Sequence, residues 1–167
     1  MEGWRDRGTE GRRDVDASSP SVSPSLHPSV LPPPSASPPS KVRVEISPGE
    51  LLDKITILEI KSEQITDPAK LENVRIQLDS LEASRAESLP PSGELDRLTR
   101  ELKTVNESLW RIEDDIRECE RDENFGPRFI ELARSVYRTN DRRAALKRQI
   151  DDLLGSRIVE EKSYEQY

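Results

Sequence analysis

Three polar residues on an otherwise apolar helix face are the residues of this sequence best placed to carry chemistry. Asn140, Arg143 and Lys147 follow one another at spacings of three and four residues. At about 100° per residue, this spacing places them on one face of a helix. The rest of that face is apolar and is formed by Phe129, Leu132, Ala133, Val136, Ile150 and Leu154. The pattern predicts amide and cationic side chains that point into the protein.

Polar groups on a buried face need partners, because burying them unpaired costs several kcal/mol. The candidate partners are Asp53 and Glu59 in an earlier predicted helix and Asn106 in a later one. One interpretation is a structural polar layer that fixes how the helices align. The other is a binding site for an anionic group, recognised by the two cations of this face together with Arg138. The sequence leaves both interpretations open.

Trp110 is a second candidate interaction residue. It lies one position away from the apolar stripe of its own helix, where a charged residue would be expected. Packing under a third helix would explain its position. An exposed tryptophan that anchors a protein interface is the alternative, since tryptophan is enriched among residues that dominate binding.

Evidence for catalysis is weak. The sequence contains no G-x-S-x-G, P-loop, dinucleotide-binding or H-E-x-x-H motif, and its one histidine, His27, lies in the N-terminal segment. Cys119 occupies an apolar heptad position, which predicts an inert buried thiol. The acidic residues between 113 and 123 fit no calcium loop, and nearby arginines are expected to neutralise them. We therefore expect no cofactor and no metal, and the sequence favours a protein without catalytic activity.

Four helices must position these residues. Local start signals occur at Ser47-Pro48, Asp67-Pro68, Ser92 and Pro127, and stop signals occur at Pro90-Pro91 and Gly155. They predict helices over 48–66, from 68 to the proline pair, from 93 to a break at 124–127, and from about 127 to the glycine at 155. Gly49 is interpreted either as a tolerated first-turn glycine or as a site where backbone approaches a ligand closely.

The third predicted helix carries an apolar stripe in which spacings of three and four alternate without interruption. The stripe is formed by Leu95, Leu98, Leu102, Val105, Leu109, Ile112, Ile116 and Cys119. This period of about 3.5 residues is typical of a helix packed along its length on another, with a left-handed twist. Short connections make successive helices antiparallel neighbours. The sequence therefore predicts an all-α, up-down bundle of about four helices, or two packed hairpins, with a long coiled-coil-like hairpin formed by 93–154. Residues 42–46 and 158–159 could add one small pairing of two strands.

Composition separates the chain into two parts. Residues 1–40 hold eight of the thirteen prolines and many serines. We expect this segment to be a disordered tail, or an upstream extension that does not belong to the natural start. Residues 41–167 are expected to form a single helical domain. Its charges of both signs are interspersed, which argues against nucleic acid, and no segment is long and apolar enough to span a membrane. A single cysteine indicates the cytoplasm.

Several sequence runs resemble a bacterial family of small proteins of unknown function. The first run, ISPGELLDKITILEIK, covers 46–61, and a closing EEKSY covers 160–164. Three further similar runs cover 105–115, 125–134 and 137–143. The resemblance implies no established activity. It implies an accessory role in surface-polysaccharide metabolism.

These observations favour a non-enzymatic helical protein that acts by binding other protein surfaces, including a second copy of itself as a homodimer. The alternative is a helical module that binds or transforms an anionic small molecule or a glycan precursor. Its site would be the polar patch between the helices predicted at 48–66 and 127–154. The identity of the partner or ligand does not follow from the sequence.

Overall fold

The computed structural model describes residues 42–163, which form four helices and no strand. The helices are α1 (Pro48–Gln64), α2 (Pro68–Ser88), α3 (Gly93–Arg121) and α4 (Pro127–Leu153). These bounds confirm the predicted all-α fold and its four helices. Within the described part of the chain, none of the helices has the length and apolar composition needed to cross a lipid bilayer. The expected N-terminal tail lies outside the described residues.

Side chains and glycine fix the helix ends as the sequence predicts. Ser47 Oγ accepts the Glu50 N–H at 3.2 Å, and the Asp67 carboxylate accepts two N–H groups of the first turn of α2. Ser92 caps α3 in the same way. Beyond α4, Gly155 adopts φ +64°, a left-handed conformation that favours glycine. Because these signals are local, the sequence alone was sufficient to place the helix ends.

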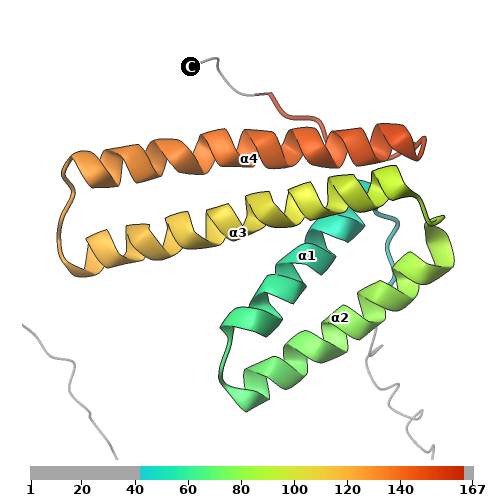
Figure 1. Cartoon of the computed structure of the whole chain (residues 1–167), viewed down its shortest axis with the longest axis horizontal. Helices are drawn as coiled ribbons and strands as arrows, with labels where there is room; N and C mark the ends of the chain where they lie inside the picture. The colour runs from blue at the N-terminus through green and yellow to red at the C-terminus, as the bar shows by residue number, and fades with distance from the viewer. Residues whose placement is uncertain (1–41, 164–167) are drawn as a thin grey trace, which may run out of the picture. The chain divides into compact units, whose positions relative to one another are not determined.

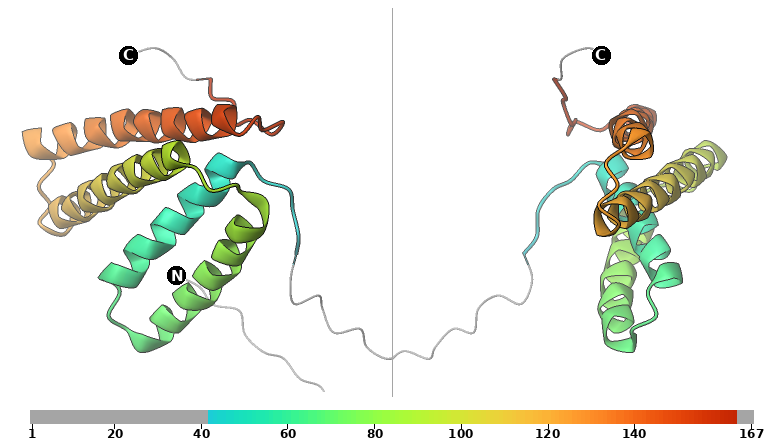
Figure 2. Two further views of the ribbon diagram at one scale, coloured as in Figure 1. Left: turned by 45° about the vertical axis from the view of Figure 1, so that its right-hand side comes forward. Right: turned by 90° about the vertical axis from the view of Figure 1, so that its left-hand side faces the viewer.

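The four helices form two hairpins that cross (Figures 1 and 2). Helices α3 and α4 run side by side, whereas α1 packs against the first part of α3 and the last part of α4 and then diverges from them. Among the described helices, α2 packs closely on α1 alone. The half of the α3–α4 hairpin that includes its tip therefore extends past the other two helices.

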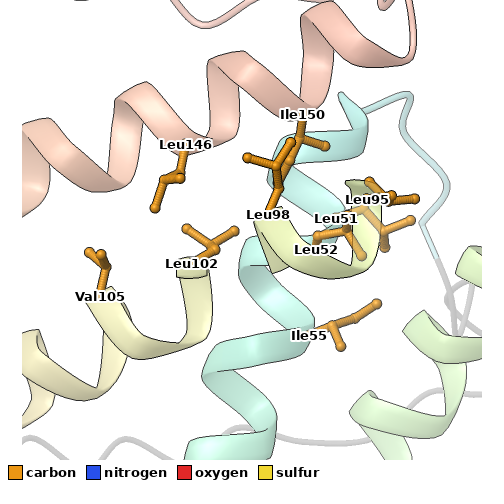
Figure 3. Close-up of a cluster of buried hydrophobic side chains, with 9 residues drawn as sticks. All are labelled: Leu51, Leu52, Ile55, Leu95, Leu98, Leu102, Val105, Leu146 and Ile150. Carbon is orange, nitrogen blue, oxygen red and sulfur yellow. The ribbon is translucent and has the colours of Figure 1, made fainter. Parts of the chain in front are cut away.

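The hydrophobic core lies where α1 is wedged between α3 and α4 (Figure 3). Leu52 and Ile55 of α1, Leu102 of α3 and Ile150 of α4 are each 0% exposed. This position explains why α1 is apolar on most of its sides. The remaining members of the core cluster are Leu51, Leu95, Leu98, Val105 and Leu146.

The predicted pairing of two strands is wrong. Residues 42–47 and 156–163 contain no strand, and Val42 and Val44 are exposed to solvent. An isolated two-stranded ribbon is only marginally stable in water, and neither segment has an apolar surface to cover it. Ion pairs hold the segment after α4 against that helix instead, since Glu160 binds Lys147 and Glu161 binds Arg148.

Gly49 is the position at which α1 approaches α4 most closely, so neither sequence interpretation of this glycine is correct. A Cβ atom at this position would lie 2.5 Å from the carbonyl oxygen of Lys147. The Gly49 N–H donates a 2.7 Å hydrogen bond to the buried carboxylate of Asp151. The N-terminal dipole of α1 also favours a negative charge there. The contact is therefore made by the protein's own α4 and requires glycine.

We predict that Gly49→Ala destabilises the protein strongly, because the added methyl group meets backbone that cannot move away alone. Overpacking of this kind costs about 1–3 kcal/mol or more. Gly93→Ala is the matched control, since it also lies in the first turn of a helix but has no atom within 4 Å of the added Cβ. It should be neutral or stabilising by up to about 1 kcal/mol. Urea unfolding of both variants tests this, and equal stabilities would contradict the close approach.

Candidate functional site

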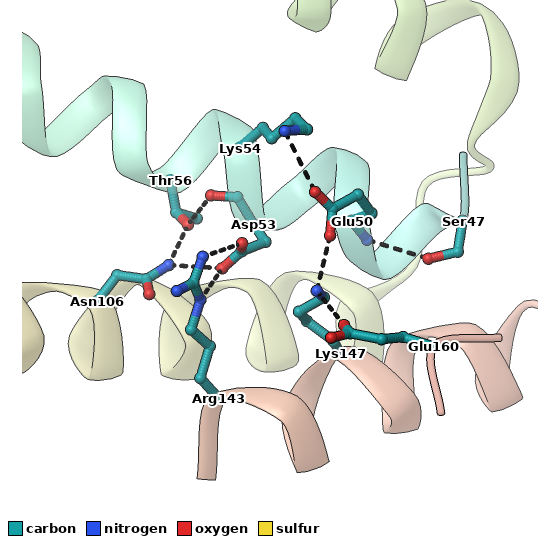
Figure 4. Close-up of polar contacts among 9 residues, drawn as sticks. All are labelled: Ser47, Glu50, Asp53, Lys54, Thr56, Asn106, Arg143, Lys147 and Glu160. Carbon is teal, nitrogen blue, oxygen red and sulfur yellow. Dashed lines mark hydrogen bonds and ion pairs between the residues drawn. The ribbon is translucent and has the colours of Figure 1, made fainter. Parts of the chain in front are cut away.

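A buried carboxylate joins the three central helices (Figure 4). The Asp53 side chain on α1 is 2% exposed and accepts two hydrogen bonds from Arg143 of α4, one of them from Nε at 2.7 Å. Asn106 of α3 donates its amide N–H groups to Asp53 Oδ1 at 2.9 Å and to Thr56 Oγ1 at 3.0 Å. Thr56 in turn donates to the backbone carbonyl of Asp53. All four residues therefore belong to one connected polar network.

The Asp53–Arg143 pair is a bidentate ion pair, the strongest common form of a charged contact. The hydrogen bond to Asp53 raises the pKa of Arg143 above its usual value although burial opposes this. The positive charge of Arg143 is therefore already offset within the protein. This arrangement supports the structural interpretation of the polar patch over the anion-binding one.

A second charged cluster lies one turn farther along α4. Lys147 Nζ donates to Glu50 of α1 at 2.7 Å and to Glu160 of the C-terminal segment at 2.6 Å. Burial is the largest single influence on both Lys147 and Glu50 and disfavours their charged forms, but the hydrogen bonds and opposite charges outweigh it. The pKa of Lys147 is therefore raised and that of Glu50 is lowered. The contribution of Lys54, 3.2 Å from Glu50, acts in the same direction.

A shallow pocket of about 150 Å³ opens beside the Asp53–Arg143 pair, where α1 diverges from α3 and α4. We call it the α1–α3–α4 pocket. It is lined by Ile57, Ile60, Asn106, Leu109, Trp110, Glu113, Asn140 and Arg143. A larger hollow of about 320 Å³ lies at the connection between α2 and α3, but its Arg85 pairs with Glu82 and Asp96. Of these two hollows, only the smaller one contains candidate site residues.

The structure brings some of the predicted site residues together and separates others. Trp110, Asn140 and Arg143 line the same pocket. Trp110 is half-buried beside Ile57 of α1, so a third helix does pack near it.

Two residues expected in the polar patch lie elsewhere. Glu59 binds Lys103 at 3.1 Å rather than a residue of α4. Arg138 is exposed and pairs with Glu131, because it is five residues from Arg143 and therefore about 140° away around α4. It cannot join an anion site formed by the patch.

Sequence reasoning missed two carboxylates of the site. Glu50 was not among the predicted site residues, but its side chain reaches Lys147. Glu160 directly follows the segment 158–159, which was predicted to pair as a strand, and it too was not among the predicted site residues.

Some of the acidic residues at the end of α3 are paired with arginines, as the sequence predicts. Arg117 binds Glu113 and Asp114, and Arg128 binds Asp115 and Glu118. Arg121 and Arg134 form no comparable ion pair with an acidic residue within residues 42–163. Over the same range, no group of three or more histidine, cysteine or acidic side chains is placed to hold a metal ion.

We predict that Arg143→Met destabilises the protein by about 3–5 kcal/mol, because it leaves the Asp53 carboxylate buried without its counterion. Replacing both partners, as in Asp53→Leu with Arg143→Leu, should cost less than Arg143→Met alone, since no unpaired buried charge remains. Chemical denaturation of the single and double variants measures this. A double variant less stable than the single one would contradict the assignment.

The second cluster predicts a dependence on pH. A lowered pKa for Glu50 means that its stabilising contribution is complete above the unfolded value of 4.5 and is lost as the pH falls through the folded value. Glu50→Gln should therefore lower the melting temperature at neutral pH, and its difference from wild type should narrow below pH 4.5. Glu45→Gln, at an exposed position, is the control. A difference that stays constant down to acid unfolding would show that Glu50 has an ordinary pKa.

Residues 42–167 match the family of unknown function DUF6165. No curated protein and no solved structure matches the chain. The matching region begins just before α1 and contains every residue of the network and the pocket. The chain thus belongs to the DUF6165 family of proteins of unknown function.

Proposed function

We propose that this protein is a non-enzymatic helical module that binds a protein surface, and that the surface it binds is a second copy of itself. The contact would be made by the open half of the α3–α4 hairpin, which we define as residues 111–140. The observation that carries this proposal is an apolar helix stripe that continues beyond the reach of α1.

Burial along α3 supports the proposal. Leu98, Leu102 and Val105, which face α1 and α4, are at most 2% exposed. Farther along the same stripe, Ile112 and Ile116 are half-buried, and Cys119 near the end of α3 is again 2% exposed. Ile130 of α4 and Phe125, in the connection between α3 and α4, are each 52% exposed. Exposed apolar surface of this kind, which neither α1 nor α2 covers, is typical of an interface.

Charge complementarity favours a second copy as the partner. The segment from Arg111 to Glu123 contains seven acidic residues and three arginines. The segment from Pro127 to Arg142 contains four arginines and two acidic residues. A two-fold axis through the open half would place α3 of one copy beside α4 of the other. The acidic helix would then lie against the basic one at two symmetric places.

The alternative function, a site for an anionic molecule at the polar patch, has less support. Arg143 and Lys147 are each bound to carboxylates of the protein, so little uncompensated positive charge remains there. A cytoplasmic protein fits the single buried Cys119, which has no disulfide partner. An accessory role in surface-polysaccharide metabolism, which the family resemblance implies, would add a protein of that pathway as a further partner.

We predict that the purified protein sediments as a dimer at micromolar concentration. Ile130→Glu should weaken the dimer at least about tenfold, because it places a charge in the apolar contact. Ile76→Glu is the matched control, since Ile76 is equally apolar and is 59% exposed on α2, away from the open half. A wild-type protein that remains monomeric at high concentration, or equal effects of the two variants, would contradict the proposal.

A further inference from the structure

The α1–α3–α4 pocket contains hydrogen-bonding atoms that the protein itself leaves unused. Asn106 is 5% exposed and donates both N–H groups of its amide, but its carbonyl oxygen Oδ1 has no partner among the described residues. Figure 4 shows this oxygen pointing away from Asp53. No fully buried side-chain nitrogen or oxygen in residues 42–163 lacks a partner. Asn106 Oδ1 must therefore reach the surface of the pocket that Asn106 lines.

Three more planar groups line the same pocket with unused hydrogen-bonding capacity. Neither the amide of Asn140 nor the indole N–H of Trp110 forms a hydrogen bond within residues 42–163. Arg143 binds Asp53 through Nε and Nη2, which leaves Nη1 available. Donors and acceptors thus face one small volume from α3 and α4, while α1 contributes the apolar side chains of Ile57 and Ile60.

The pocket carries no excess of charge that would attract an anion. The Arg143 guanidinium is neutralised by Asp53, and Glu113 at the pocket is bound to Arg117 at 2.8 Å. A phosphate or carboxylate would need an uncompensated cation or several backbone N–H donors. The charges therefore favour a neutral ligand.

Size and lining narrow the class of ligand further. A cavity of about 150 Å³ accommodates a single benzene-sized ring, which matches the volume found here. A sugar ring carries hydroxyl groups on most of its carbons, and each one pressed unpaired against Ile57, Ile60 or Leu109 would cost about 1–3 kcal/mol. A flat heterocycle has two apolar faces and only a few polar atoms at its edge. Carboxamide groups form hydrogen bonds with such edges, and the planes of indole and guanidinium groups stack on the faces of the ring.

We propose that the α1–α3–α4 pocket binds a neutral planar heterocycle of the size and hydrogen-bonding pattern of a single nucleobase. Asn140 and Asn106 contact its polar edge, and Trp110 and Arg143 contact its face. This site adjoins the open half of the hairpin, which contributes Glu113 and Asn140 to its lining, and it adds a small ligand to the proposed protein contact. The base could come from a free nucleoside or from a charged nucleotide, and these two sources differ in their phosphate.

Trp110 provides a direct probe of the site. The sequence has two tryptophans, so Trp4→Phe leaves Trp110 as the only source of tryptophan fluorescence. Uridine and adenosine are titrated separately, with excitation at wavelengths that the bases do not absorb. At least one of them should change the fluorescence saturably and raise the melting temperature, because a ligand that binds only the folded state stabilises it.

Variants locate the binding. Asn140→Ala should weaken nucleoside binding about tenfold, the loss expected for one good amide–base contact. It should leave the melting temperature of the free protein unchanged, because Asn140 makes no hydrogen bond within residues 42–163. Asn73→Ala, at an exposed position on α2, is the matched control and should bind as the parent does.

Four results would each overturn the proposal. The first is no saturable response to either nucleoside up to its solubility limit. The second is unchanged binding in Asn140→Ala, or equal weakening in Asn73→Ala. The third is tighter binding of uridine monophosphate than of uridine, which would identify an anion site. The fourth is a saturable response to glucose without a response to the nucleosides, which would identify a sugar site.

Discussion

The ion pair between Asp53 and Arg143 is the interaction that fixes how the three central helices are arranged. The Asp53 carboxylate is removed from water, so its charge must be offset by the protein. Arg143 from α4 and Asn106 from α3 both donate to the same oxygen. Sliding α4 by one turn would replace Arg143 with Asn140 or Lys147 opposite Asp53, and neither of these side chains can form the bidentate pair. The core of leucines and isoleucines tolerates small shifts, whereas this polar network allows one alignment of the helices.

That alignment determines where the other features of the molecule lie. Helix α1 has 17 residues and α3 has 29, or about 25 and 43 Å at the usual rise of an α-helix. Since Gly49 holds the start of α1 against the end of α4, α1 covers only part of the longer hairpin and then diverges from it. The pocket forms at the point of divergence, and the open half begins there. Both proposed sites are therefore consequences of one crossing of helices.

The sequence correctly predicted the features that depend on residues close together in the chain. It did not predict the features that depend on how α1 crosses α3 and α4. Caps at Ser47, Asp67 and Ser92 are local, and the stripe of α3 repeats within one helix, so the helices and their ends could be inferred. Placing Asn140 and Arg143 on a buried face also required only helical periodicity. The role of Gly49 and the contact between Lys147 and Glu160 depend on the angle at which α1 meets α4, which periodicity does not contain. The alternation of apolar and polar residues near Val42 led to a wrong strand prediction, because such alternation indicates a strand only where a neighbouring strand exists to pair with it.

The same ion pair also determines what can bind beside it. An anion that entered the pocket would compete with Asp53 for Arg143, and a displaced Asp53 would remain buried with only its hydrogen bond from Asn106. Breaking such a pair costs about 3–5 kcal/mol, which is more than an exposed anion gains from one arginine. A neutral ligand needs only the unused carboxamide groups of Asn140 and Asn106 at its edge and the planes of Trp110 and Arg143 at its face, and it leaves the network intact. The interaction that holds the helices together therefore selects against negative charge at the pocket next to it.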